Sequence, residues 1–177
     1  MNDTASSEDD ALIDAIERFL AGEVRPVAIA LEQADEYPKA IVEQMRDMGL
    51  FGAIIPEAYG GLGLSAQTYA RLIETIAAEW MSLSGIINSH LIMASAVLRF
   101  GTEAQKEYFL PRFARAELRG GIALTEPDCG TDLQAIRTVA RREGEHYLVN
   151  GAKTWITNGL HGNCFALLVK TDPKADP

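Results

Sequence analysis

Residues 120–132 read Gly120-Gly121-Ile122-Ala123-Leu124-Thr125-Glu126-Pro127-Asp128-Cys129-Gly130-Thr131-Asp132, and the pattern of apolar residues changes at this stretch. Before it, apolar residues recur at steps of three and four, which is typical of amphipathic helices. After it, β-branched and aromatic residues gather in short runs bounded by glycine, which is typical of strands. The sequence therefore predicts an α+β protein with an all-helical domain over residues 1–119 and an antiparallel β domain over residues 120–177.

The helical part is predicted to contain helices with recognisable start and stop residues. The expected ranges are 11–33, 38–49, 65–80, 82–100 and a short helix that begins at 102. Pro26 is expected to bend or interrupt the first helix, because proline cannot donate a backbone hydrogen bond. Ser65 is a predicted N-cap, and Thr102 with Gln105 forms a predicted capping box. Pro111 is expected to end or restart the last helix.

The β part is predicted to consist of short strands bounded by glycine. Their expected ranges are 121–124, 137–142, 146–149, 153–157 and 164–169. Glu143-Gly144 and Asn150-Gly151 are predicted turns, and Asn-Gly favours a two-residue hairpin turn because both residues tolerate positive φ. Residues 170–177 are polar and contain proline, so the predicted sheet would end with an open edge. We therefore expect a truncated β domain, or a partner segment that completes it.

Charge and composition exclude several classes of function. The 177 residues include 25 acidic and 16 basic side chains, and the net charge of -9 disfavours nucleic-acid binding, which depends on Lys and Arg. Cys129 and Cys164 lie far apart without metal-ligand spacing, which favours incidental thiols over a zinc site or a disulfide. Residues 1–10 are acidic, unlike a signal peptide, and we expect no apolar run that approaches the ~18 residues of a membrane span. These features predict a soluble cytoplasmic protein.

Two stretches carry residue types suited to a ligand. Thr125 to Asp132 follows a predicted strand and is rich in hydroxyls and glycine, so it can present backbone N–H and hydroxyl donors to a phosphate or a ring edge. A plain turn is the alternative. On an alternating strand, Trp155 and Thr157 would face the same side and offer a stacking surface beside a hydroxyl. Here the alternative is a core tryptophan beside a surface threonine.

Together, the two stretches resemble the acyl-CoA dehydrogenase family. Ala123 to Asp132 is similar to the family's first flavin loop, and Asn150 to Gly159 is similar to its second signature. Other landmarks that look like the family are Gly49 to Gly52, Ile55 to Glu57, Tyr59 to Gly61, Phe100 to Glu103 and Gln105-Lys106. The resemblance implies an N-terminal helical bundle, the start of an antiparallel β-barrel, and a C-terminal helical domain that is absent from this chain.

FAD is the cofactor that the resemblance implies. It assigns Leu124 and Thr125 to the flavin ring, and Thr131 to both the FAD pyrophosphate and the pantetheine arm of the substrate. Trp155 would pack on the isoalloxazine, and Thr157 would hydrogen-bond near N5. The full set of implied cofactor-binding residues is Ile122, Leu124, Thr125, Gly130, Thr131, Trp155, Ile156 and Thr157. Many relatives have serine at the position of Thr131, and some have an aromatic residue at the position of Ile122.

The long apolar helix predicted over 82–100 offers candidate substrate contacts. Asn88, Ile92 and Ser95 are spaced i, i+4 and i+7 and so share one face, and in the family this helix borders the acyl pocket. Alternatively, the three residues simply pack between helices. His90 and His161 lack a partner in the sequence that would make them catalytic, and we expect both to be structural or exposed.

The family's reaction is the α,β-dehydrogenation of an acyl-CoA thioester. A carboxylate removes the α-proton, the β-hydride goes to flavin N5, and the electrons pass to an electron-transferring flavoprotein. The base comes from the C-terminal domain, so the resemblance assigns no catalytic residue here and implies an inactive fragment of an enzyme that is a homo-oligomer, a dimer or tetramer, when complete. Glutamates 57, 74, 79, 103 and 126 do not match the base position. A related acyl-CoA oxidase or flavin monooxygenase, and a non-enzymatic interaction module, are the alternatives.

Overall fold

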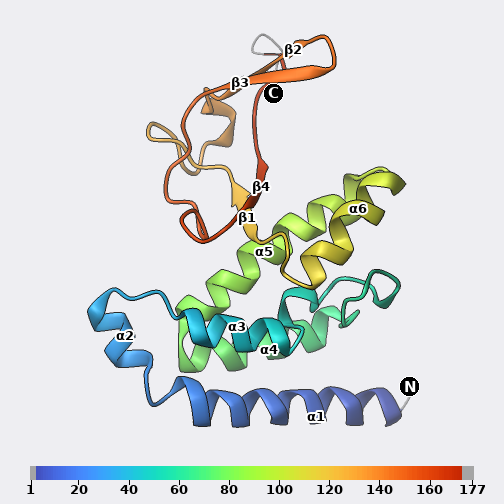
Figure 1. The fold of residues 1–177 in the computed structure, drawn as a ribbon, viewed down its shortest axis with the longest axis vertical. Coiled ribbons are helices and arrows are strands. Elements are labelled where there is room, and N and C mark those ends of the chain that lie inside the picture. Colours follow the sequence, from blue (N-terminus) through green and yellow to red (C-terminus); the bar gives the residue numbers. More distant parts are fainter. Residues whose placement is uncertain (1–2, 173–177) are drawn as a thin grey trace.

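The structure, a computed structural model, describes residues 3–172. Helices fill one part of the molecule and strands the other, and α5 runs from the helices towards the strands (Figure 1). The helices are α1 (Asp3–Phe19), α2 (Ala28–Ala34), α3 (Lys39–Asp47), α4 (Ala66–Glu79), α5 (Met81–Phe100) and α6 (Glu103–Ala114). Short 3-10 turns lie at Leu50–Gly52, Glu57–Tyr59 and Leu133–Ala135.

Most predicted helix boundaries are confirmed, but the predicted start of the first helix at residue 11 is wrong, because α1 begins at Asp3. The first predicted helix is interrupted at Pro26, since α1 continues into a π-helical turn over Leu20–Val24 and α2 begins at Ala28. Ser65 caps α4 by accepting a hydrogen bond from the N–H of Thr68 at 3.1 Å. The capping box of Thr102 and Gln105 is present at the start of α6.

The expectation for Pro111 is wrong, because this residue lies inside α6. Proline in a helix interior typically costs about 3 kcal/mol, through the lost hydrogen bond and the clash of its ring with the preceding turn. Beside it, however, Leu110, Phe113 and Ala114 are buried against Met93 of α5. Burial of this apolar face therefore outweighs the local preference of proline to stop the helix.

Helix α5 is the central helix of the bundle. Leu83, Ile87 and Leu91 are almost completely buried, and α5 packs against both α4 and α6. By length and composition alone this helix could cross a membrane, so the expectation that no apolar run reaches that length is wrong. Half of the apolar window is buried inside the molecule, as is typical of a core helix.

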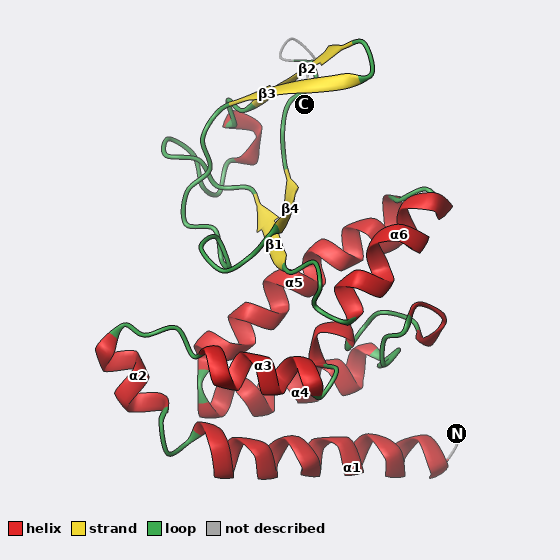
Figure 2. Cartoon of the chain, in the orientation of Figure 1, coloured by secondary structure: helices red, strands yellow, loops and turns green. Residues whose placement is uncertain are grey.

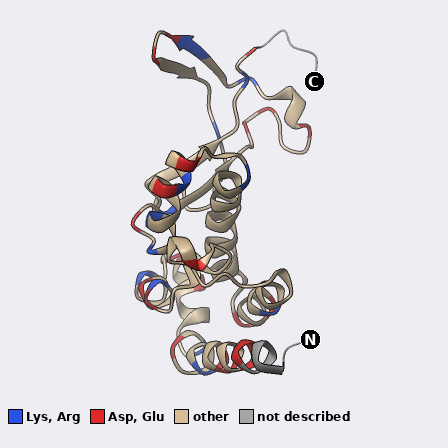
Figure 3. Ribbon diagram, turned by 90° about the vertical axis from the view of Figure 1, so that its right-hand side faces the viewer, with Lys and Arg blue, Asp and Glu red and all other residues tan. Residues whose placement is uncertain are grey.

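The strands form two separate pairs (Figure 2). β1 (Gly120–Ala123) pairs in parallel with β4 (Cys164–Leu167), and β2 (Val139–Glu143) pairs antiparallel with β3 (His146–Asn150). The predicted turn at Glu143-Gly144 is confirmed, with Gly144 at φ 63°. The hairpin exposes Arg141 and Arg142 of β2, and Figure 3 draws the basic residues of this strand in blue.

Two predictions for the β part are wrong. Residues 153–157 form no strand, and Asn150-Gly151 is no hairpin turn, because Asn150 still pairs with Val139 at the end of β3. Residues 153 and 154 bond instead to the loop that follows β1. Trp155 then takes a φ of 57°, which is incompatible with extended backbone.

The strand region leaves apolar surface uncovered. All five residues of β3 are exposed, including Tyr147, Leu148 and Val149. Trp155 and Leu160 are also exposed. This surface contrasts with the compact core between the helices.

Candidate functional site

The two predicted flavin loops lie side by side. The N–H of Thr154 donates to the carbonyl oxygen of Thr125 at 2.9 Å, which joins the loop after β1 to the segment 153–157. These segments are 29 residues apart in the sequence, and neither motif alone predicts their contact. The structure therefore brings the two motifs into one candidate site.

A buried ion pair reinforces this junction. The ammonium of Lys153 lies 2.8 Å from Glu126 Oε1 and 2.8 Å from the carbonyl oxygen of Leu124. The side chains of Lys153 and Glu126 are only 8% and 6% exposed. Sequence reasoning did not single out Lys153, since a lysine between two glycine-rich turns gives no signal of burial.

The carboxylate of Glu126 is engaged on both oxygens. Oε2 accepts from the N–H of Arg137 at 2.6 Å, and Oε1 accepts from the N–H and the hydroxyl of Thr138 as well as from Lys153. Burial acts to raise the pKa of Glu126, but the hydrogen bonds from Lys153, Thr138 and Arg137 outweigh it and lower this pKa to about 2. An ionised, fully engaged carboxylate is unsuited to removing a substrate proton near neutral pH.

The second loop presents its side chains differently from the prediction. Trp155 and Thr157 do not share a strand face, because the backbone turns at Trp155. Both are nevertheless exposed, and Trp155 has 89% of its surface accessible. Ile156, between them, is half-buried and lines a cleft with Ala123 and Phe165.

Asn158 anchors this loop to the helical part. Its Nδ2 donates to the carbonyl oxygens of Gly120 at 2.8 Å and Ile86 at 3.0 Å, so one buried amide contacts both β1 and α5. The backbone of Asn158 has a φ of 66°. Asparagine tolerates this left-handed conformation better than most residues, so the Asn158-Gly159 pair was the sequence signal that could have predicted a turn here.

The first loop leaves donors available. Leu124 and Thr125 are half-buried, and no acceptor within residues 3–172 binds their N–H groups. The backbones of Glu126 and Cys129 bond reciprocally in a tight turn, after which Gly130 and Thr131 are exposed. Ile122 is half-buried within β1.

This set of groups fits a flavin nucleotide. Free N–H groups at Leu124 and Thr125 can serve polar ring edges, and exposed Thr131 and Gly130 can approach a pyrophosphate. The exposed indole of Trp155 is a stacking surface for an aromatic ring. The individual roles of these side chains stay predictions.

The candidate substrate residues of α5 have different environments. Asn88 accepts a hydrogen bond from the Tyr69 hydroxyl of α4, as the packing alternative expects. Ser95 is half-buried, whereas Ile92 has 47% of its surface exposed. Of the three, Ile92 is therefore the most accessible to a ligand.

His90 and His161 take structural positions. His90 is fully buried between the rings of Phe51 and Phe113, and its Nε2 lies 3.2 Å from the carbonyl oxygen of Phe113. Burial lowers the pKa of His90 to about 4. His161 is exposed on one side and stacks on Tyr37, with ring centroids 3.6 Å apart.

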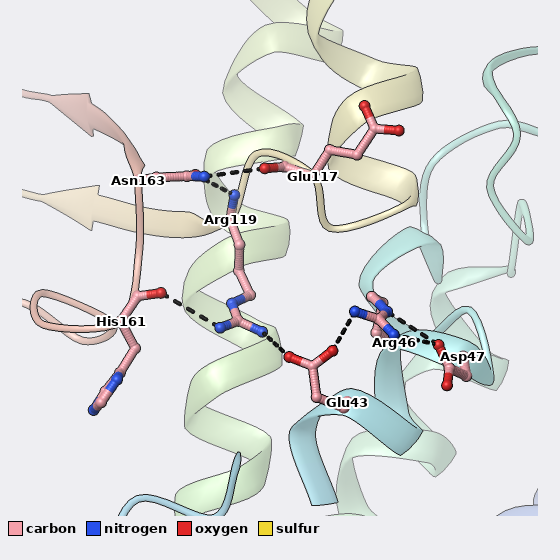
Figure 4. A network of polar contacts seen from close by, with 7 residues as sticks. All are labelled: Glu43, Arg46, Asp47, Glu117, Arg119, His161 and Asn163. Atoms are coloured by element: carbon pink, nitrogen blue, oxygen red, sulfur yellow. Dashed lines mark hydrogen bonds and ion pairs between the residues drawn. The ribbon is translucent and has the colours of Figure 1, made fainter. Parts of the chain in front are cut away.

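A polar network also links α3 to the strands (Figure 4). The backbone N–H of Arg119 donates to Asn163 Oδ1 at 2.8 Å, and Nδ2 of Asn163 donates to the carbonyl oxygen of Glu117 at 3.0 Å. The Arg119 guanidinium lies 3.9 Å from Glu43, which also pairs with Arg46. The network holds β4 against the helices and lies outside the two loops.

Comparison with known proteins identifies the group to which both parts of the chain are similar. Residues 6–117 match the family described as acyl-CoA dehydrogenase, N-terminal domain, and residues 121–177 match acyl-CoA dehydrogenase, middle domain. A short-chain specific acyl-CoA dehydrogenase from Clostridium acetobutylicum is 32% identical over 173 residues, covering 97% of this chain and 46% of that protein.

Solved structures with the same fold include two acyl-CoA dehydrogenases. The enzyme from Geobacillus kaustophilus superposes with a TM-score of 0.87 and 35% identity, covering 96% of this chain and 45% of that one. An acyl-CoA dehydrogenase complexed with FAD, from Bacillus anthracis, has a TM-score of 0.79 and 34% identity, covering 93% of this chain and 29% of that one. The chain thus spans less than half the length of these relatives.

Proposed function

Because the chain belongs to the acyl-CoA dehydrogenase family, we propose that it forms the flavin-facing front part of an FAD-dependent enzyme that performs α,β-dehydrogenation of an acyl-CoA thioester. The junction of the two loops carries this proposal. The bond from Thr154 to Thr125, together with the bond from Lys153 to Leu124, joins the two loops that carry the predicted ring contacts, and this supports a shared flavin site.

The residues of the site have separate tasks in this proposal. Trp155 stacks on the flavin ring, and the N–H groups of Leu124 and Thr125 bind its polar edge. The hydroxyl of Thr157 donates near N5, and Thr131 binds the pyrophosphate and the pantetheine arm. When bound, the flavin supplies the acceptor for the hydride that leaves the β-carbon of the substrate.

The general base is proposed to come from outside residues 3–172. Glu126 has a pKa of about 2 and is fully engaged, and Glu79 is paired with Arg25. We further propose that Ile92 and Ser95 border the acyl chain, and that electrons pass to an electron-transferring flavoprotein. The complete enzyme is proposed to be a cytoplasmic homo-oligomer.

The direct test is to add FAD and a panel of acyl-CoA thioesters to the 177-residue chain, with an artificial electron acceptor. We expect weak flavin binding and no turnover. Turnover should be lost because a positioned general base alone contributes about 10² to 10⁴ in rate. Turnover comparable to that of a full-length relative would contradict the assignment of the base. Oxygen consumption by the longer enzyme would favour the oxidase alternative.

Flavin binding is tested with Trp155→Ala. We expect FAD affinity to fall by about tenfold, since loss of aromatic stacking typically costs about 0.5 to 1.5 kcal/mol beyond the lost contact area. Tyr147→Ala is the matched control, because Tyr147 is another exposed aromatic residue, on β3. Equal FAD dissociation constants for the two variants, measured by fluorescence titration, would remove Trp155 from the site.

A further inference from the structure

Lys153 holds both ends of a short segment in the first loop. Its ammonium bridges the carbonyl oxygen of Leu124 and the carboxylate of Glu126, each at 2.8 Å. The next residue along, Thr154, donates its N–H to the carbonyl oxygen of Thr125, which lies between them. Residues 124–126 are thus bonded, one after another, to residues 153–154.

Stability alone is a poor explanation for this buried pair. Removing two charges from water is costly, and well-packed apolar residues often serve as well or better at such sites. What an apolar pair could not supply is direction, because the ammonium must point at one particular carbonyl. The bond from Lys153 to Leu124 therefore specifies the orientation of a peptide group.

That peptide group has a second end. In a trans peptide unit the C=O of one residue and the N–H of the next point in opposite directions. The carbonyl of Leu124 is held by Lys153, so the N–H of Thr125 points away from Lys153. This N–H has no acceptor within residues 3–172 and is available to a ligand.

We propose that Lys153, held by Glu126, is a positioning residue that aims the Thr125 N–H at the flavin ring and locks the two flavin loops into one unit. The proposal rests on the proposed function for the identity of the ligand. The hydrogen bonds between the two loops are a property of the chain itself, so their stability can be measured without flavin.

The test compares Lys153→Met with the wild type and with Lys39→Met. Methionine removes the ammonium but keeps an unbranched apolar chain, and Lys39 is exposed at the start of α3, so its variant makes the same chemical change away from the site. Hydrogen–deuterium exchange of peptides covering residues 150–157 reports on the Thr154 N–H. We expect this amide to exchange at least about tenfold faster in Lys153→Met and unchanged in Lys39→Met.

A second readout uses FAD. Where the wild type binds FAD, Lys153→Met should weaken binding by about tenfold and alter the resolved flavin absorbance bands, whereas Lys153→Arg, which keeps the positive charge, should recover most of both. If Lys153→Met does not fold, the double variant Lys153→Met with Glu126→Gln replaces it, because the neutral amide can still accept from Thr138.

The outcomes separate the two proposals. Exchange at Thr154 that stays within about twofold of the wild type would overturn the positioning role, whatever FAD does. Faster exchange with unchanged FAD affinity and spectrum would also overturn it. A third outcome is that the wild-type chain binds no FAD, while Thr154 exchanges faster in Lys153→Met as expected. This outcome would count against the proposed function but would support the role of Lys153 in joining the two loops.

Discussion

Single residues hold the candidate site to the rest of the molecule, and Asn158 is the clearest case. Its side chain binds two carbonyl oxygens from separate elements, and its backbone is left-handed. We expect Asn158→Ala to destabilise the chain by about 2 to 4 kcal/mol, through two lost hydrogen bonds and the strain of a left-handed alanine. Urea unfolding measures this change.

Asn158→Gly separates the two causes at this position. Glycine adopts positive φ without strain, so this variant should show only the loss from the missing hydrogen bonds. We expect its midpoint to lie between those of the wild type and Asn158→Ala. Unfolding midpoints of both variants equal to that of the wild type would mean that Asn158 does not anchor the loop.

At the scale of elements, the approach of β1 to α5 sets where the first loop begins. A Cβ on Gly121 would meet the hydroxyl oxygen of Ser89 at 2.1 Å and the carbonyl oxygen of Thr157 at 3.2 Å. Gly121→Ala must therefore push β1 from the helix or move Ser89, at a cost of about 1 to 3 kcal/mol. Thermal unfolding is the measurement.

A compensating change tests the cause of that loss. Ser89→Ala removes the oxygen nearest to the added methyl group, although the Cβ of Ser89 would still lie only 3.1 Å away. The double variant should thus regain part of the stability lost in Gly121→Ala, giving a coupling energy of about 0.5 kcal/mol or more. Strict additivity of the two changes would show that the clash with Ser89 is not the cause.

At the scale of the whole molecule, two buried groups make stability depend on pH. His90 has its pKa lowered from 6.5 to about 4, and Glu126 has its pKa lowered from 4.5 to about 2. For a group with a lowered folded-state pKa, the stabilising contribution is complete above the unfolded-state pKa and is lost as pH falls through the folded-state value. The His90 contribution should therefore decline between about pH 6.5 and 4, and that of Glu126 between about pH 4.5 and 2.

The two contributions can be separated by substitution. We expect the free energy of unfolding to fall by about 3 kcal/mol between pH 7 and 4 through His90, the value that corresponds to its shift. His90→Gln, which does not titrate, should have a flatter profile over this range even if it is less stable at pH 7. Parallel profiles for the two proteins would contradict the assignment to His90.

Local patterns in the sequence predicted most of the elements but not their partners. The caps at Ser65 and Thr102 and the interruption at Pro26 depend on neighbours within a few residues, so sequence spacing specifies them. Pro111 was predicted wrongly because burial of α6 overrides local preference. The strand expected at 153–157 failed for a related reason, since its backbone bonds to a distant loop.

Composition and residue spacing were enough to predict that helices precede strands, and to identify the two loops that carry the hydroxyls, glycines and indole of the candidate site. The buried pair of Lys153 and Glu126 that joins those loops, and the bonds from Asn158 to α5 and β1, became visible only in the folded molecule. The two kinds of feature differ in the sequence distance over which their interactions act. Caps and periodicity arise between residues three or four apart. A buried ion pair, in contrast, forms only when folding brings distant segments together and removes the surrounding water.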